Sequence, residues 1–418
     1  MVQLHKKFVS SQVKELIERF LKKEIERKYI QQIIGIGKTR FFALIKKYKK
    51  CPDTFSIQYE RTGKPHTIDH EIEKNILKEL KLDKTLIADK DMTLQSYNYS
   101  YIKDRLETKY KQIVSLPTII VRAKKYNFYD PQPKRKAHDR MVLTNHVGEL
   151  IQHDSSVHKW SPYVKEKWYL ITTIDDYSRF MFYAKLLNHE SVWVHIEALE
   201  AVFLTYGLPL SYYVDCHSIF RFVRGRDELH YEHHLLTDEA DPQWKQVLDD
   251  CTVKVTYALS PQAKGKIERP YRWLQDRIVR TCAREHVADI KHGNRILDQE
   301  MNRYNYHQIH STTGEVPYHR FQRAMKEKLS FFREFAIKPP FLSTKDIFCL
   351  RLNRTADAYR QISINNVPLK VNNLNPYEPV NLRIYPLNST FSEVRFWSNG
   401  NLLDVQKLKN DILKTVHF

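Results

Sequence analysis

The first part of the chain shows a helical pattern of apolar positions. Val13, Ile17 and Leu21 recur at the spacing that places them on one face of a helix. A second apolar helix is expected to end at Gly35-Ile36-Gly37, because glycine commonly follows a helix, and a basic helix is expected to begin directly after it. A helix, a short glycine-containing turn and a basic helix make the layout of a helix-turn-helix. We therefore predict a helix-turn-helix domain over residues 1–55, with an ordinary small helical bundle as the alternative.

The next segment repeats the helical pattern. Ile76 and Leu80 share one helix face, and Ser115 is expected to cap a later basic helix that carries Pro117 in its first turn. A basic stretch punctuated by prolines follows this helix and is expected to be a linker. We therefore predict a second helical DNA-binding domain with a basic linker over residues 56–130.

The middle of the chain changes to alternating and short apolar runs, which indicate strands. The expected strands are Glu149 to Asp154, Trp168 to Tyr177 and Phe180 to Leu187, and a helix is expected from Ser191 to Leu204. Further strand and helix patterns follow in the order strand, strand, helix. Such an order is typical of an α/β sheet with helices on its faces, of the ribonuclease-H-like kind. We expect this core to span residues 141–335.

The last part of the chain reads as short strands joined by tight turns. The pattern begins after Pro339-Pro340, and it contains hairpin turn chemistry at Asn365-Asn366 and at Ser398-Asn399-Gly400-Asn401. One expected strand begins at Asp346. Together these short strands predict a small β-barrel over residues 340–418.

The charge is concentrated in the N-terminal third. The chain has a net charge of +19, and residues 1–140 hold 32 Lys and Arg against 17 Asp and Glu. A basic segment on a nearly neutral body is typical of a nucleic-acid-binding protein, although a merely soluble basic surface is the alternative. The side chains that we expect to contact DNA from the two helical domains and the loop between them are Lys38, Thr39, Arg40, Arg61, Lys64, Arg122 and Lys124.

These contacts are expected to differ in kind. Lys38, Thr39 and Arg40 begin the basic helix, where a helix-turn-helix protein meets base edges. Arg61 and Lys64 lie on a loop that could enter the minor groove as an arm, or could be a solvated linker.

Cysteine usage and hydropathy exclude several classes of protein. The five cysteines show no paired spacing, which argues against a zinc finger, a disulfide framework or a redox motif. No run of apolar residues approaches the length of a membrane span, and no signal peptide opens the chain. We therefore expect a soluble protein in a reducing compartment, with no membrane partner.

One acidic residue stands out by its position between a strand and a helix. Glu268 opens an expected helix after a strand near residues 252–259, and Lys264, Lys266 and Arg269 surround it in sequence. Neighbouring cations and a helix start both favour the ionised carboxylate, the form that a hard divalent cation binds.

Two aspartates complete the set. Asp154 and Asp215 each follow a short apolar run, so we expect both acids at strand ends. Acids at strand ends and a third at a helix start can converge at one edge of a sheet and hold magnesium. The adjacent pair Asp175-Asp176 is expected to bound a turn instead.

Asp154, Asp215 and Glu268, with the stretch Ser260 to Arg269, resemble the D, D, E triad of the retroviral-integrase superfamily. The likeness is closest to bacterial insertion-sequence transposases of the ISNCY type, and the segment Tyr304 to Thr313 also fits that pattern. The 52 residues between Asp215 and Glu268 exceed the spacing of the tightest integrases and imply an insertion. We place this insertion at His217 to Asp249, where it could be a DNA-contacting flap or a mobile loop.

The resemblance implies a DNA transposase. Asp154, Asp215 and Glu268 would be the catalytic residues and would hold two Mg²⁺ or Mn²⁺ ions for DNA cleavage and strand transfer. Lys264, Lys266 and Arg269 would contact DNA beside the ions.

The same resemblance implies the partners and the place of action. The partners would be double-stranded DNA, as terminal inverted repeats and target, and further copies of the chain, at least as a dimer. The protein would act in the prokaryotic cytoplasm, associated with the nucleoid. A DNA-binding regulator and a structure-selective nuclease on the same fold are the alternatives.

Overall fold

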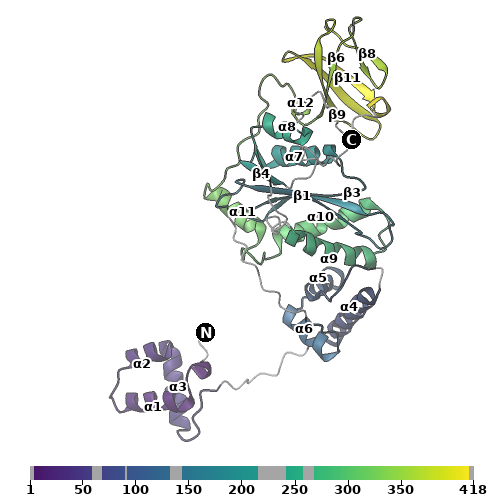
Figure 1. The fold of residues 1–418 in the computed structure, drawn as a ribbon. Coiled ribbons are helices and arrows are strands. Elements are labelled where there is room, and N and C mark those ends of the chain that lie inside the picture. The colour runs from purple at the N-terminus through teal and green to yellow at the C-terminus, as the bar shows by residue number, and fades with distance from the viewer. Residues whose placement is uncertain are drawn as a thin grey trace, which may run out of the picture. The chain divides into compact units, whose positions relative to one another are not determined.

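The computed structural model describes residues 4–58, 68–89, 92–131, 144–214, 242–257 and 268–413, apart from the side chains of Glu268 and Arg269. The chain divides into two compact units, Met1–Glu73 and Lys74–Phe418. Figure 1 shows the helices and strands of both. None of the described helices is both long and apolar enough to cross a membrane.

The first unit is a small helical body with its own apolar core. A 3₁₀ turn, η1 (Leu4–Lys6), precedes α1 (Ser10–Leu21), α2 (Arg27–Ile34) and α3 (Lys38–Lys50). Gly35 ends α2 with φ +67°, a left-handed conformation that glycine adopts without strain. The three helices lie where the apolar spacing predicts them. Their core consists of Leu4, Val13, Ile17, Ile30, Ile34, Ile36, Phe41, Ile45, Phe55 and Ile57.

Three further helices precede the sheet. They are α4 (His70–Ala88), α5 (Tyr99–Tyr110) and α6 (Leu116–Lys125). Ser115 caps α6 as predicted, because its Oγ accepts a hydrogen bond from the backbone N–H of Thr118 at 3.4 Å. The hydroxyl of Tyr99 donates to the carbonyl of Phe128 at 3.0 Å and so ties the end of the α6 segment back to α5.

The central sheet is mixed, and its strand order is β3-β2-β1-β4-β5. The strands β1, β2 and β3 pair antiparallel, whereas β1 with β4 and β4 with β5 pair parallel. This sheet, with helices on its faces, confirms the α/β core that the sequence predicts. Its strands are β1 (Ile151–His158), β2 (Trp168–Asp175), β3 (Met181–Leu187), β4 (Ser211–Val214) and β5 (Lys254–Tyr257).

Two pairs of helices cover the two faces of the sheet. Figure 1 shows α7 (Val192–Tyr206) and α8 (Gln243–Asp250) on one side and α9 (Glu268–Arg284) and α10 (Ile290–Tyr306) on the other. The helix α8 begins inside the predicted insertion, His217 to Asp249, and ends one residue after it. On α10, a Cβ at Gly293 would come within 2.7 Å of the Trp168 ring, so the helix approaches β2 closely only because that position is glycine. The helix α11 (Pro317–Lys326) follows.

The C-terminal strands do not form the predicted barrel. The described strands make an open four-stranded sheet, β11-β10-β9-β6, and a separate hairpin of β7 and β8. Short strands and tight turns are common to open sheets and barrels, and only the pairing of the edge strands closes a barrel. The elements are α12 (Thr344–Ile347), β6 (Leu350–Thr355), β7 (Gln361–Ile364), β8 (Val367–Lys370), β9 (Pro379–Pro386), β10 (Phe391–Ser398), β11 (Asn401–Lys409) and η3 (Asn410–Leu413).

Two local features of this region test the turn and strand predictions. Asn365 and Asn366, at φ +48° and +64°, turn the hairpin of β7 and β8, and Asn399 and Gly400 join β10 to β11 at φ +47° and +77°. Positive φ at both central residues is the requirement of a tight hairpin turn, as predicted. The strand expected from Asp346 begins later, because Asp346 forms a capping box at the start of α12.

Candidate active site

Asp154 lies within β1, not at its end as predicted. The strand continues to His158, and Asp154 pairs across to Thr172 of β2. The prediction was wrong because the residues after Asp154 are mostly polar and the apolar pattern stops there, whereas the antiparallel pairing with β2 holds the strand to its end. Asp154 is 9% exposed, so the sheet holds a nearly buried carboxylate.

The other neighbour of β1 is β4, which ends directly before the second predicted acid in the sequence. Gln152 of β1 pairs in parallel with Tyr213 of β4, and β4 ends one residue later at Val214. The chain therefore leaves β4 close to the level of Asp154. Asp215 is the next residue in the sequence, and it lies outside the described residues.

The first turn of α9 crosses the same part of the sheet. Thr172, the cross-strand partner of Asp154, donates a hydrogen bond from its Oγ1 to the hydroxyl of Tyr271 at 2.8 Å. Tyr271 lies three residues after Glu268, the first residue of α9, and is buried. The helix that Glu268 opens is thus held against the strand pair that carries Asp154. The described elements bring together the middle of β1, the end of β4 and the start of α9.

The motif predicted around Glu268 also contains three basic residues. Lys264 and Lys266 fall outside the described residues, and the side chain of Arg269, like that of Glu268, is not described. Among the side chains that are described, no group of three His, Cys, Asp or Glu could hold a metal ion. Asp215 and the Glu268 carboxylate are not among those side chains.

A buried polar chain behind β1 was not predicted from the sequence. Nδ1 of His153 lies 2.8 Å from Oγ1 of Thr173, and its Nε2 lies 2.8 Å from Nδ1 of His195 on α7. Nε2 of His195 lies 3.0 Å from Oε1 of Glu190. Side chains alternate along a strand, so His153 faces α7 while Asp154 faces the opposite side. These contacts hold β1 against α7, and no spacing in the sequence signals them.

The adjacent acids Asp175 and Asp176 bound a turn, as predicted. The Asp175 carboxylate accepts hydrogen bonds from the N–H of Gly148 at 2.9 Å and from the N–H and Oγ of Ser178, each at 2.6 Å. Asp176 accepts from Arg179 at 3.1 Å and has further partners. Burial raises the pKa of Asp175 to about 6, although these hydrogen bonds act to lower it.

The raised pKa of Asp175 should make the protein less stable as the pH rises from about 4 to about 6. The unfolded chain releases this proton near the ordinary pKa of about 3.9, whereas the folded state retains it to about 6. The stabilisation is therefore present below that window and lost above it, and its size is roughly 2–3 kcal/mol. In the variant Asp175→Asn, the asparagine side chain at this position has no carboxyl group to titrate. In urea unfolding, wild-type stability relative to this variant should fall between pH 4 and 7, and a pH-independent difference would contradict the assignment.

The residues predicted to contact DNA fall into two groups in the structure. Lys38 and Thr39 are exposed at the start of α3, and Arg40 is partly exposed beside them. On α6, Arg122 is partly buried and Lys124 is exposed, with its Nζ 4.6 Å from the centre of the Tyr129 ring. Arg61 and Lys64 lie outside the described residues.

Two curated proteins are similar to this chain in sequence. The putative transposase y4bF of Sinorhizobium fredii is 29% identical over 184 residues, which are 44% of this chain and 36% of that protein. The transposase for insertion sequence IS1202 of Streptococcus pneumoniae is 24% identical over 233 residues, 56% of this chain and 44% of that protein. The chain thus spans less than half the length of the curated relatives that it matches. They confirm the resemblance to bacterial transposases.

Solved structures and family models add little to this likeness. The catalytic core of HTLV-2 integrase in complex with magnesium (trimeric form) gives a TM-score of 0.30 at 16% identity, covering 44% of this chain and 99% of that one. The simian T-cell lymphotropic virus intasome in complex with the PP2A regulatory subunit B56 gamma gives 0.31 at 14%, covering 72% and 97%. TM-scores this low carry no information on function. No family model matches the chain.

Proposed function

We propose that this chain is the DNA transposase of an insertion sequence, a polynucleotidyl transferase with a D, D, E triad. The observation that carries the proposal is the convergence of three elements: β1 with Asp154, the end of β4 directly before Asp215, and the start of α9 at Glu268. The bond between Thr172 and Tyr271 holds α9 at that place. The similarity to the two curated transposases supports the same activity.

The three carboxylates suit a pair of Mg²⁺ or Mn²⁺ ions, because hard divalent cations prefer oxygen ligands. We assign Asp154, Asp215 and Glu268 as the ligands. Bound ions would activate a water or a DNA 3′-hydroxyl and stabilise the leaving oxygen of an in-line displacement. In this scheme, Lys264, Lys266 and Arg269 neutralise phosphates beside the cleaved bond.

Recognition of the element ends is assigned to the basic N-terminal third. Lys38, Thr39 and Arg40 at the start of α3 would meet base edges, as the first residues of a recognition helix do. Arg61 and Lys64 would act as an arm between the two helical parts, and Arg122 and Lys124 would contact DNA from α6. The joining of two ends to one target requires at least a dimer on DNA, in the cytoplasm where the nucleoid lies.

Arg40→Ala should weaken binding to the terminal repeat by about 1–3 kcal/mol and change binding to scrambled DNA little, because only base contacts carry sequence information. Matched titrations of cognate and scrambled duplexes at one salt concentration measure the difference. Lys50→Ala at the far end of α3 is the control, and it should weaken both duplexes alike. Equal loss on both duplexes for Arg40→Ala would show that Arg40 contacts only the backbone.

The activity itself is tested with duplexes that end in the element's terminal repeat. The full chain with Mg²⁺ should nick these duplexes at the repeat and join the new 3′ end to a second DNA. Cutting that ignores the repeat would indicate a nuclease. Binding to the repeat with no cutting would indicate a regulator.

A further inference from the structure

Three arginines form a row along α9 on the side away from the sheet. Arg277, Arg280 and Arg284 follow one another at three and four residues, so they share one helix face. Their side chains are 1%, 0% and 4% exposed. Buried arginines need several acceptors each. Asp276 of α9 supplies some of them to Arg280, and most of the others come from the helices α4, α5 and α10.

Two acids of α4 bind Arg280 and Arg284, at the C-terminal end of this row. The Asp83 carboxylate accepts from Arg280 at 2.8 Å through one oxygen and from Arg284 at 2.5 Å through the other. Glu79 also accepts from Arg284, and both acids are fully buried. Asp83 therefore ties two arginines of α9 to α4.

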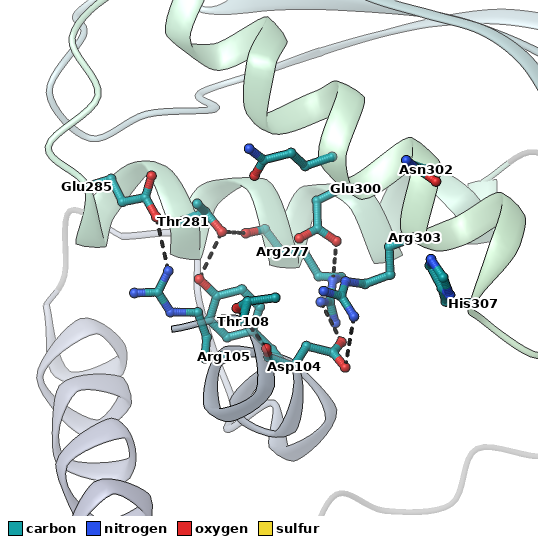
Figure 2. A pocket seen from close by; sticks show the side chains of 12 residues that line it. Asp104, Arg105, Thr108, Arg277, Thr281, Glu285, Glu300, Asn302, Arg303 and His307 are labelled. Carbon is teal, nitrogen blue, oxygen red and sulfur yellow. Dashed lines mark hydrogen bonds and ion pairs between the residues drawn. The ribbon is translucent and has the colours of Figure 1, made fainter. Parts of the chain in front are cut away.

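Helix α5 binds Arg277, at the N-terminal end of the row. Arg277 donates to Asp104 of α5 at 2.7 Å and to Glu300 of α10 at 2.5 Å, as Figure 2 shows. The hydroxyls of Tyr101 and Thr281 are hydrogen-bonded at 2.8 Å. A polar cavity of about 390 Å³ lies beside these contacts. We call the ion pairs between these helices the buried ionic lattice, and its members are Glu79, Asp83, Asp104, Arg277, Arg280, Arg284 and Glu300.

An ionic lattice holds two bodies in one register. Apolar surfaces can slide with little loss, whereas a buried charge that moves away from its partner stays desolvated without compensation, at a cost of several kcal/mol. Helices α4 and α5 can therefore dock on α9 in one arrangement only. The sequence predicts a second helical DNA-binding domain with a basic linker over residues 56–130, and these contacts show how α4 and α5 meet α9.

The buried ionic lattice lies between α6 and the first turn of α9, where Glu268 begins the helix. On one side, α6 is tied to α5 through the bond from Tyr99 to Phe128. On the other side, Arg280 lies twelve residues after Glu268 on the same helix, roughly 18 Å along its axis. The first turn of that helix is bonded to Thr172, beside Asp154. A continuous set of contacts thus joins α6 to the catalytic edge.

We propose that the buried ionic lattice is a ruler for DNA cleavage. It fixes the distance between DNA held at α6 and the carboxylates at the sheet edge, and so selects which phosphodiester is cut. Asp83, Arg280 and Arg284 are positioning residues, since none of them touches the reacting atoms. The inference rests on the proposed function, and it adds what determines the position of the cut.

The test is the position of the cut, mapped to the nucleotide on a duplex that carries the terminal repeat. Asp83→Asn in the full chain keeps the size of the side chain and removes its charge. Each arginine retains one carboxylate, Asp276 for Arg280 and Glu79 for Arg284, so the variant should still fold. Wild type should cut at one position. The variant should bind the duplex equally well, and the share of its cuts at neighbouring nucleotides should rise several-fold.

The control is Glu107→Gln, which removes one negative charge from an exposed position of α5 and should leave the cut at a single position. Tyr101→Phe, which removes only the bond to Thr281, is a milder second variant and should show the same shift to a smaller extent. A general loss of stability would slow cutting without moving it. The position of the cut therefore separates a ruler from a merely structural contact.

Hydrogen exchange in α4 reports the docking independently of DNA. Faster exchange in Asp83→Asn together with scattered cuts supports the ruler. Faster exchange with a single unchanged cut overturns it, and so does unchanged exchange, since Asp83 would then not hold the docking. If wild type cuts at no defined position, the proposed function fails first and the ruler fails with it.

Discussion

Replacing Asp154 with asparagine is expected to abolish end cleavage and strand joining while the element ends are still bound. The substitution keeps the size of a side chain that is 9% exposed, so the packing around β1 should remain. It removes the negative charge that a divalent ion requires of its ligand. Asp215→Asn and Glu268→Gln should behave alike, because each would remove one ligand of the same site.

Three measurements make this test specific. Gel shifts with the terminal repeat report binding, cleavage assays with Mg²⁺ and with Mn²⁺ report chemistry, and thermal unfolding with and without Mn²⁺ reports metal binding apart from activity. Asp249→Asn is the matched control, since Asp249 is an exposed aspartate of α8 in the same core and its side chain is 52% exposed. Near wild-type strand transfer by Asp154→Asn would remove Asp154 from the triad.

Arg280→Ala is expected to lower the free energy of unfolding by about 3–5 kcal/mol, the usual cost of removing one partner from a buried ion pair. Arg280 is fully buried, and its loss leaves Asp83 with one arginine and deprives Asp276 of three hydrogen bonds. The largest part of this cost should appear where α4 docks on α9. Urea unfolding of the full chain measures the change.

The control for that loss is Arg295→Ala, an exposed arginine on α10, which should change stability by less than about 0.5 kcal/mol. Arg280→Met tests the cause. Methionine fills part of the volume but brings no charge, so a loss similar to that of alanine would assign the effect to charge. Full recovery of stability by methionine would show that packing, and not the ion pairs, holds α4 to α9.

The local periodicity of apolar residues was sufficient to predict most of the helices and strands. The spacing of Val13 and Ile17 located α1, the alternation before Asp175 located β2, and Asn365-Asn366 located a hairpin turn. These signals are local, because a helix or a tight turn is specified by residues a few positions apart. The excess of basic residues and the acidic motif could also be recognised in the sequence, because neither composition nor a resemblance to a family depends on tertiary structure.

Tertiary structure alone decided the rest, because those features depend on pairings between distant segments. Asp154 lies inside β1 since β2 pairs with residues that show no apolar pattern. The C-terminal strands form an open sheet since their edge strands are not paired with each other. Nothing near Arg280 in the sequence indicates that Asp83, 197 residues earlier, is its partner. In the sequence, arginines at three- and four-residue spacing are typical of a solvent-exposed helix face. Only the tertiary structure shows that α4 covers this face of α9.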